Sequence, residues 1–167
     1  ESLNIGLERG DNIEDVKENL NIIAKYFGVN KILRVKQDHT NIVKVFKEDD
    51  KDITGMEGAN ADFMPIADAI VTNQRNVLIS TKSADCIPAL LFDEKNEIIA
   101  CAHGSWKSTQ LGIFENTIDE MLKIGANIDN IVVLIGPCLR QQSFEITSEF
   151  YDKFLSENKD NEKYFKA

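Results

Sequence analysis

The sequence predicts an α/β fold in one domain that spans residues 1–167. A length of 167 residues suits one domain with a substantial buried core. Apolar residues recur at spacings of three and four along 13–27 and again along 111–122, which is typical of amphipathic helices. Between these helices, residues 77–103 consist of short apolar runs separated by polar turns, which is typical of β-strands.

The first helix is expected to begin near Asn12 and to end at Gly28. Asp11 or Asn12 can cap its N-terminus through a side-chain oxygen, and glycine commonly stands just past a helix C-terminus. The inward face of this helix is predicted from the apolar residues that share one stripe. These are Ile13, Val16, Leu20, Ile23 and Phe27.

A strand is predicted at 33–37, where apolar and charged residues alternate. His39 would lie on the inward face of that strand if the strand continued so far. Residues 42–46 are expected to form its hairpin partner or its continuation. Residues 47–68 have the glycine, proline and charged residues of a loop, and the charge run at 48–52 is interpreted as a solvated turn.

The middle of the chain predicts a strand at 77–81 and then a β-hairpin. The hairpin consists of 87–92 and 97–103, which are joined by a polar turn. Cys86 stands just before the first strand of this hairpin, and His103 ends the second. Because antiparallel strands place these two ends together, we expect Cys86 and His103 to be neighbours.

After His103 the sequence predicts a helix that ends at Gly125. The apolar run 131–135 is expected to be a buried strand, and residues 144–146 a short one. Thr147 or Ser148 can cap a last helix. The inward faces of the two helices are expected to be Leu111, Phe114, Ile118, Met121 and Leu122, and then Phe150, Tyr151, Phe154 and Leu155.

The net charge is −9, from 19 basic and 28 acidic residues. Because an acidic surface repels phosphate backbones and anionic lipid, we expect neither a nucleic acid nor a membrane partner, and we expect a small-molecule substrate. The three cysteines are odd in number and scattered, and no basic segment followed by an apolar one marks a signal peptide. We therefore expect a cytoplasmic protein, and a monomer.

The residue types most suited to metal chemistry are His39, Cys86 and His103. Two imidazoles and a thiolate are good zinc ligands, and three protein ligands leave a fourth position for water or substrate. Their spacing specifies no known short motif, so two other interpretations stay open. One is a pair of surface histidines with a small buried thiol, and the other is a metal-free Cys86–His103 nucleophilic pair.

Other candidates are weaker. Cys101 is expected to pack in the core, and Cys138 either lines the site or packs in the core. The turn at 104–108 leads into a helix and could hold a phosphate with Lys107, although such turns also serve as simple connectors. Trp106 is expected to be a core residue.

Stretches in order along nearly the whole chain match the landmarks of one family. They lie at 2–6, 10–12, 37–39, 67–72, 83–88, 102–107, 136–137 and 144–146. On these stretches the chain resembles the YfiH or laccase-domain family. Members have been described as polyphenol oxidases, as peptidoglycan editing factors and as purine nucleoside phosphorylases with adenosine deaminase activity. The resemblance implies a mixed β-sheet core flanked by helices.

The resemblance also implies the metal site and the activity. The family's zinc ligands fall on His39, Cys86 and His103, in Gln37-Asp38-His39, Ala84-Asp85-Cys86 and Ala102-His103. The implied enzyme is a zinc-dependent purine nucleoside phosphorylase that also deaminates adenosine, with nucleoside and phosphate as its substrates. Cys86, His103 and Asp85 would be its catalytic residues, with Asp85 as a proton carrier. Asn4, Gln37 and Lys107 would contact substrate.

Two departures from the family pattern leave room for other hypotheses beside the implied enzyme. Leu20 stands where the family has a ligand-contacting arginine, and Lys107 replaces another arginine. They motivate the hypothesis of a weakened homologue that keeps the zinc site. A separate hypothesis, independent of these departures, is an amide hydrolase that edits a peptidoglycan precursor with the same zinc-bound water or with Cys86 as nucleophile. The resemblance also implies that the family's first β segment would precede Glu1 and that its C-terminal portion would follow Ala167.

Overall fold

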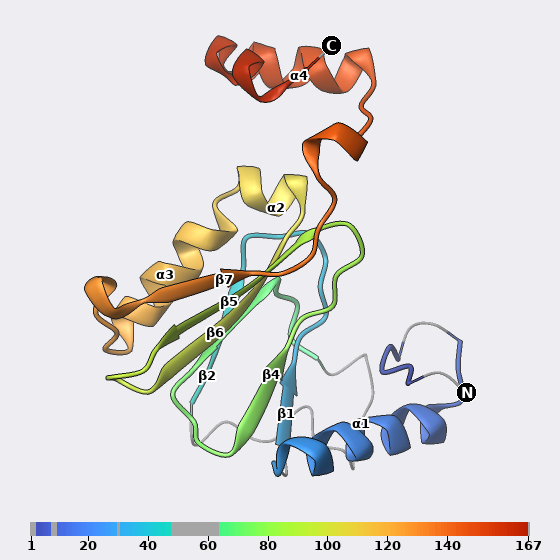
Figure 1. Ribbon diagram of the computed structural model, residues 1–167, viewed down its shortest axis with the longest axis vertical. Coiled ribbons are helices and arrows are strands. Elements are labelled where there is room, and N and C mark those ends of the chain that lie inside the picture. Colours follow the sequence, from blue (N-terminus) through green and yellow to red (C-terminus); the bar gives the residue numbers. More distant parts are fainter. Residues whose placement is uncertain (1–2, 8–9, 30, 48–63, 167) are drawn as a thin grey trace.

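The structure, a computed structural model, describes residues 3–7, 10–29, 31–47 and 64–166. Its centre is a five-stranded mixed sheet with the strand order β2-β3-β6-β5-β7, beside a two-stranded sheet of β1 and β4 (Figure 1). The charge run at 48–52 lies outside the described residues. The strands are β1 (Lys31–Arg34), β2 (Val43–Phe46), β3 (Ala69–Thr72), β4 (Val77–Ser80), β5 (Ile87–Asp93), β6 (Ile98–Gly104) and β7 (Val132–Ile135).

Helices cover the outer faces of the two sheets. Helix α3 packs on β6, β3 and β2, and α1 packs on β1, so the layers run α3, large sheet, small sheet, α1 (Figure 1). Helix α4 stands away from both sheets. The helices are α1 (Ile13–Phe27), α2 (Trp106–Gln110), α3 (Ile113–Lys123) and α4 (Ser148–Glu157), with short 3₁₀ turns η2 (Ile128–Asn130), η3 (Gln141–Ser143) and η4 (Lys159–Tyr164). The predicted mixed sheet flanked by helices is confirmed.

Helix α1 has the predicted ends. The Asn12 side chain accepts a hydrogen bond from the Glu14 N–H, and Gly28 adopts a left-handed conformation with φ 66°. Its predicted inward stripe is partly wrong, because Ile13 and Phe27 are 45% and 59% exposed. The face of the helix that packs on β1 is formed by Val16, Leu20 and Ala24, which are buried.

The predicted partner of the first strand is wrong. β1 pairs in parallel with β4, whereas β2 belongs to the other sheet and pairs in parallel with β3. Strand β3 itself was not predicted, although Ala69–Thr72 contains three successive β-branched residues, which favour a strand. The expected inward face does hold for Leu33 and Val35, which are buried between the two sheets.

The predicted β5–β6 hairpin is confirmed. The two strands pair antiparallel, with Pro88 opposite His103 and Asp93 opposite Ile98. The turn is closed by Asp93, which is fully buried and accepts hydrogen bonds from the Asn96 N–H and side-chain amide. A third bond, from the Asn127 N–H at 2.8 Å, ties this turn to the chain that follows α3.

One helix was expected after β6, but two are present. Gly112, with φ 85°, breaks the chain between α2 and α3, and this left-handed conformation suits glycine. The break rotates the inward face, so that Ile113, Thr117 and Met121 are buried. The expected inward positions of Leu111 and Leu122 are wrong, since both residues are exposed.

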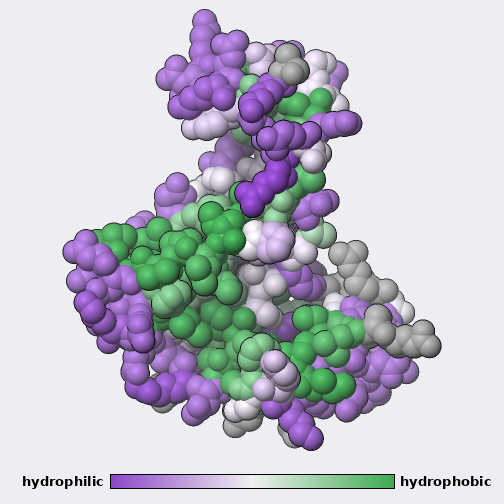
Figure 2. All heavy atoms as spheres, viewed as in Figure 1, coloured by the Kyte–Doolittle hydropathy of each residue, from purple (hydrophilic) through white to green (hydrophobic). Residues whose placement is uncertain are grey.

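Strand β7 is an edge strand, and its predicted burial is wrong. Its four residues are 46–65% exposed, and Leu90 beside it on β5 is 53% exposed. Figure 2 shows hydrophobic side chains gathered on the face over β7 and β5. Residues 144–146, expected as a short strand, form no strand. The apolar run therefore predicted the strand correctly but not its exposure, because exposure depends on whether another element packs against the strand.

Besides the cluster between α1 and β1, two packed layers hold the core. Between the sheets lie Leu33, Val35, Phe46, Ala67, Ile70 and Cys101, and beneath α3 lie Val71, Ala89, Leu91, Ile98, Ala100 and Met121. Within the described residues no helix has both the length and the apolar character needed to cross a bilayer.

We predict that Asp93→Asn lowers the thermal unfolding midpoint at pH 7. The hydrogen bond from the Asn127 N–H lowers the pKa of Asp93 below its ordinary value of 3.8. Burial opposes this shift, and the hydrogen bonds from Asn96 add to it. A lowered folded-state pKa stabilises the fold above the unfolded-state value, and this contribution is lost as the pH falls through the folded-state value. The difference in midpoint between wild type and variant should therefore shrink below about pH 4. A constant difference from pH 7 to pH 2.5, measured by circular dichroism, would contradict this role.

Candidate metal centre

Three separate segments bring His39, Cys86 and His103 to one end of the large sheet. His39 lies in the loop between β1 and β2 with φ 54°, a left-handed conformation that is uncommon outside glycine. Cys86 immediately precedes β5, and His103 lies near the end of β6. Because β5 and β6 are antiparallel, the start of one strand and the end of the other meet at the same edge.

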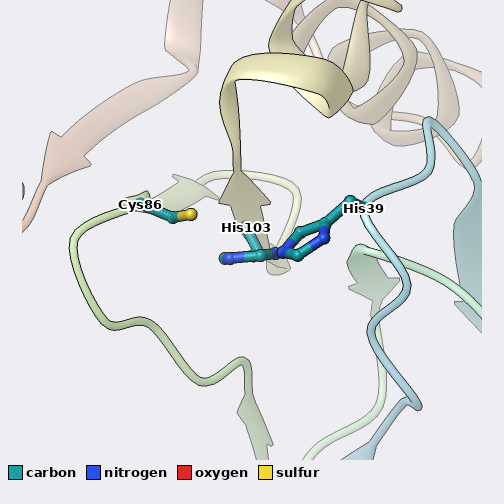
Figure 3. Close-up of side chains that lie close together, drawn as sticks. All are labelled: His39, Cys86 and His103. Atoms are coloured by element: carbon teal, nitrogen blue, oxygen red, sulfur yellow. The ribbon is translucent and has the colours of Figure 1, made fainter. Parts of the chain in front are cut away.

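The three side chains point toward one another, as Figure 3 shows. One ligand atom from each residue lies within 4.8 Å of the other two. The imidazole ring centroids are 5.3 Å apart with an interplanar angle of 34°. His103 is buried, Cys86 is half-buried and His39 is exposed, so the group is anchored in the sheet and open on the His39 side.

These residues fit a divalent transition metal. Zinc bonds of about 2.0–2.1 Å to nitrogen and 2.3 Å to sulfur place tetrahedral ligands roughly 3.4 Å apart. Small rotations of side chains that already lie within 4.8 Å would reach that spacing. The donors are two imidazoles and one thiolate, which borderline-soft metals prefer, and three ligands leave one position for a non-protein ligand.

A fourth residue, Asp68, completes the surroundings of the group, and sequence reasoning gave it no role. It lies one residue before β3 and is fully buried. Its Oδ1 accepts a hydrogen bond from His103 Nδ1 at 2.8 Å, and its carboxylate also accepts the backbone N–H groups of the loop that carries His39. The sequence feature that could have indicated a role for Asp68 is its position as the single acidic residue inside the apolar run at 67–71.

The carboxylates around the group shape its electrostatics. Burial opposes ionisation of Asp68, but hydrogen bonds from His103 and Thr40 outweigh it and lower its pKa to about 2. Because an ionised carboxylate can only accept, His103 Nδ1 must be the donor in their hydrogen bond. Burial, and then the Asp85 and Asp68 carboxylates, raise the pKa of the Cys86 thiol.

Gln37 connects the segments that carry His39 and Cys86. Its Nε2 donates to the Lys82 carbonyl and its Oε1 accepts the Lys82 N–H, both at 2.7 Å. This pair of bonds occupies both ends of the amide. The predicted substrate contact by Gln37 stays a prediction, and the contacts of its side chain in the structure are those of a brace between two segments.

The other predicted substrate residues lie in separate surroundings. Asn4 donates from its side chain to Asp11 at 3.0 Å and accepts the Gly6 N–H at 2.9 Å. Lys107 is exposed on α2, four residues past His103. The 104–108 turn uses the Ser105 and Ser108 backbone N–H groups in a reciprocal capping box, so these two donors are already occupied. Contacts of Asn4 and Lys107 with substrate remain predictions.

Asp85 and the remaining cysteines take different positions. Asp85 is exposed with φ 72°, and its carbonyl accepts the Leu139 N–H at 2.9 Å. Cys101 is confirmed as a core residue, and burial raises the pKa of its thiol to about 12. Cys138 is half-buried in the segment beside Asp85 but is not a member of the three-ligand group.

Trp106 does not lie where the sequence predicted, whereas Leu20 does. Trp106 is not a core residue, because it is 41% exposed and packs edge-on against Phe150 at 5.1 Å. Leu20 is 2% exposed in the core between α1 and β1. An arginine at this position would bury a charge among Val16, Ala24 and Ile32, so exchanging Leu20 for arginine is a poor test for a weakened homologue.

Known proteins resemble all or part of this chain. A family model described as multi-copper polyphenol oxidoreductase laccase matches residues 1–167. A purine nucleoside phosphorylase from Rickettsia prowazekii is 30% identical over 154 residues, which cover 92% of this chain and 59% of that protein. An adenosine deaminase from an unknown prokaryotic organism is 34% identical over 87 residues, which cover 52% of this chain and 33% of that protein.

A solved structure has the same fold. The YfiH protein of Bacillus licheniformis superposes with a TM-score of 0.80 at 25% identity, over 91% of this chain and 57% of that one. The chain thus spans somewhat less than three-fifths of the length of these full-length relatives. The predicted resemblance to YfiH proteins is confirmed.

We predict that Gln37→Ala loosens the segment that leads to Cys86. The variant loses both bonds to Lys82, and the bond from the Lys82 N–H alone, worth about 1 kcal/mol, should speed hydrogen exchange of that amide at least roughly fivefold. Alkylation of Cys86 by iodoacetamide should also accelerate, whereas Cys138 should react at an unchanged rate. Gln141→Ala, which removes a side-chain bond at η3 instead, is the matched control. Unchanged exchange at Lys82 would show that Gln37 does not brace this segment.

Proposed function

This chain belongs to the laccase-like YfiH family, and from that premise we propose that it is a zinc-dependent purine nucleoside phosphorylase that also deaminates adenosine. Relatives with these two names support the choice of substrate class. The observation that carries the proposal is the convergence of His39, Cys86 and His103 within 4.8 Å. A buried anchor and an open side are what a site needs to hold a metal and admit a substrate.

Zinc is the proposed metal, although the family description names copper. A histidine–cysteine–histidine set also suits a single copper ion. The chain contains only two histidines, and both belong to this group. It therefore has no imidazole left for a second copper site, and multi-copper oxidation by this chain alone is disfavoured. A bound zinc ion would supply Lewis acidity that lowers the pKa of water toward about 7.

The two reactions ask different things of the protein. In phosphorolysis a phosphate oxygen bonds to the ribose anomeric carbon as the bond to the purine nitrogen breaks, and the purine takes up a proton. In deamination a water oxygen replaces the amino group at C6, and ammonia leaves. Both reactions need a group that moves a proton beside the metal site. Asp85 directly precedes Cys86 and is exposed, so its carboxylate oxygen is the proposed carrier.

Substrate contacts complete the proposal. Lys107 would provide positive charge for phosphate from α2, and Asn4 and Gln37 would contact the nucleoside. The net charge of −9 makes a localised cation useful, because the rest of the surface repels the anion. Cytoplasmic residence and a monomeric state belong to the same proposal, and light scattering tests the second.

The direct experiment incubates zinc-loaded protein with adenosine and phosphate. Chromatography should detect adenine and ribose 1-phosphate from phosphorolysis and inosine from deamination, with hypoxanthine as the product of both steps. Without phosphate, inosine alone should accumulate. Folded, zinc-loaded protein that forms none of these products would refute the proposed activity. It would leave the weakened homologue or the amide hydrolase, which a peptidoglycan-peptide substrate would then distinguish.

We predict that Cys86→Ala weakens zinc binding by more than about 100-fold. Loss of a residue that only supports a metal ligand costs at most about that much, and loss of a ligand should cost more. One of three ligands is gone in this variant, and the remaining two imidazoles bind much less tightly. Competition with a chromophoric chelator measures the affinity, and elemental analysis identifies the metal. Cys138→Ala removes a second half-buried thiol and should leave affinity unchanged. Equal affinities for wild type and Cys86→Ala would remove Cys86 from the ligand set.

A further inference from the structure

We propose that Asp68 is the positioning residue of the site, because its one carboxylate holds both histidines of the His39–Cys86–His103 group in their metal-ready arrangement. This inference rests on the proposed zinc site and deepens it. Asp68 would touch neither metal nor substrate. It would act on the metal site through the two histidines. It holds His103 by a side-chain hydrogen bond and His39 by hydrogen bonds to the backbone.

The bond to His103 sets which ring nitrogen is free. His103 Nδ1 lies 2.8 Å from Asp68 Oδ1, and the side chains of both residues are buried. With Nδ1 as the donor, the unprotonated nitrogen of a neutral ring is Nε2. A carboxylate behind a ligand histidine fixes the tautomer and the ring orientation, and it increases the basicity of the ligand.

The bonds to the His39 loop set its backbone. Three successive N–H groups, those of Asp38, His39 and Thr40, donate to the Asp68 carboxylate at 3.2, 3.2 and 2.6 Å. The Thr40 hydroxyl adds a fourth bond at 3.0 Å. The loop is thus wrapped around the carboxylate, which compensates for the uncommon left-handed conformation of His39.

The carboxylate is itself held by the sheet. The Asp68 N–H donates to the Ile42 carbonyl at 3.0 Å, and the Asp68 carbonyl accepts the His103 N–H at 2.8 Å. Its backbone therefore bridges the start of β2 and the end of β6, which are the segments next to the two histidines. Among the residues that the structure describes, no hydrogen bond joins Asp68 to the Cys86 segment, which Gln37 braces instead. The inference therefore concerns the histidines alone.

The experiment compares zinc affinity and histidine tautomers in wild type and Asp68→Asn. The asparagine keeps the size of the side chain but places an NH₂ group against backbone donors, so the His39 loop should shift. We expect zinc affinity to fall about 10- to 100-fold, as for other supporting residues of metal sites. Nitrogen-15 NMR of the metal-free wild type should show His103 protonated at Nδ1 and unprotonated at Nε2 at a pH where its ring is neutral.

Asp38→Asn is the matched control. It removes the same charge next to His39, but the Asp38 side chain is exposed and only its backbone N–H bonds to Asp68. Its zinc affinity should stay within about twofold of wild type, since an exposed charge contributes little. Circular dichroism confirms that each variant is folded. If Asp68→Asn does not fold, Thr40→Val should still give a smaller loss of zinc affinity, because it removes the hydroxyl that donates to Asp68 and accepts the Ile42 N–H but leaves the carboxylate in place.

Two results would overturn the inference. One is a folded Asp68→Asn protein that binds zinc as tightly as wild type, and the other is wild-type His103 that carries its proton on Nε2. Neither readout uses turnover. Zinc-loaded wild type without nucleoside products would therefore refute the proposed activity while the role of Asp68 stands. If the wild type is fully active and Asp68→Asn binds zinc as tightly as wild type, the role of Asp68 would be refuted while the proposed activity stands.

Discussion

The candidate site depends on the single edge at which four segments of the large sheet meet. β3 and β5 begin at this edge, and β6, antiparallel to both, ends there. β2 is parallel to β3 and so begins at the same edge, directly after the loop that carries His39. The strand directions alone therefore bring together residues that are up to 64 positions apart in sequence, His39 and His103.

At that edge the sheet buries a charge, and the charge organises the loops around it. An isolated buried carboxylate is costly, because it loses its hydration without compensation. Asp68 recovers this cost through five hydrogen bonds, from three backbone N–H groups, one hydroxyl and one imidazole. Because the carboxylate needs these donors, the loop before β2 cannot move away without exposing unpaired groups. The same bonds that stabilise the buried charge therefore restrict both histidines.

Local features of the fold were predictable from the sequence, and long-range ones were not. The Asn12 cap, the Gly28 stop and the β5–β6 hairpin depend on neighbouring residues, so their signals are in the local pattern. The partner of β2 and the exposure of β7 depend on what packs across from them, which periodicity does not contain. The metal ligands were predictable mainly through family resemblance, since their spacing follows no local rule. Asp68 was missed because its donors lie 28 to 35 positions away.

The three candidate ligands are not held equally firmly, and this follows from which strands support them. His103 lies within the central strand β6 and bonds to a buried carboxylate, and His39 is held by the same group. The Cys86 segment instead lies between β6 and the exposed edge strand β7. There the Gly136 N–H donates to Pro88 and the Leu139 N–H to Asp85, each at 2.9 Å. Backbone bonds at an exposed edge open more readily than bonds in a buried ladder. The backbone that carries the cysteine is therefore held less firmly than the backbone that carries the two histidines.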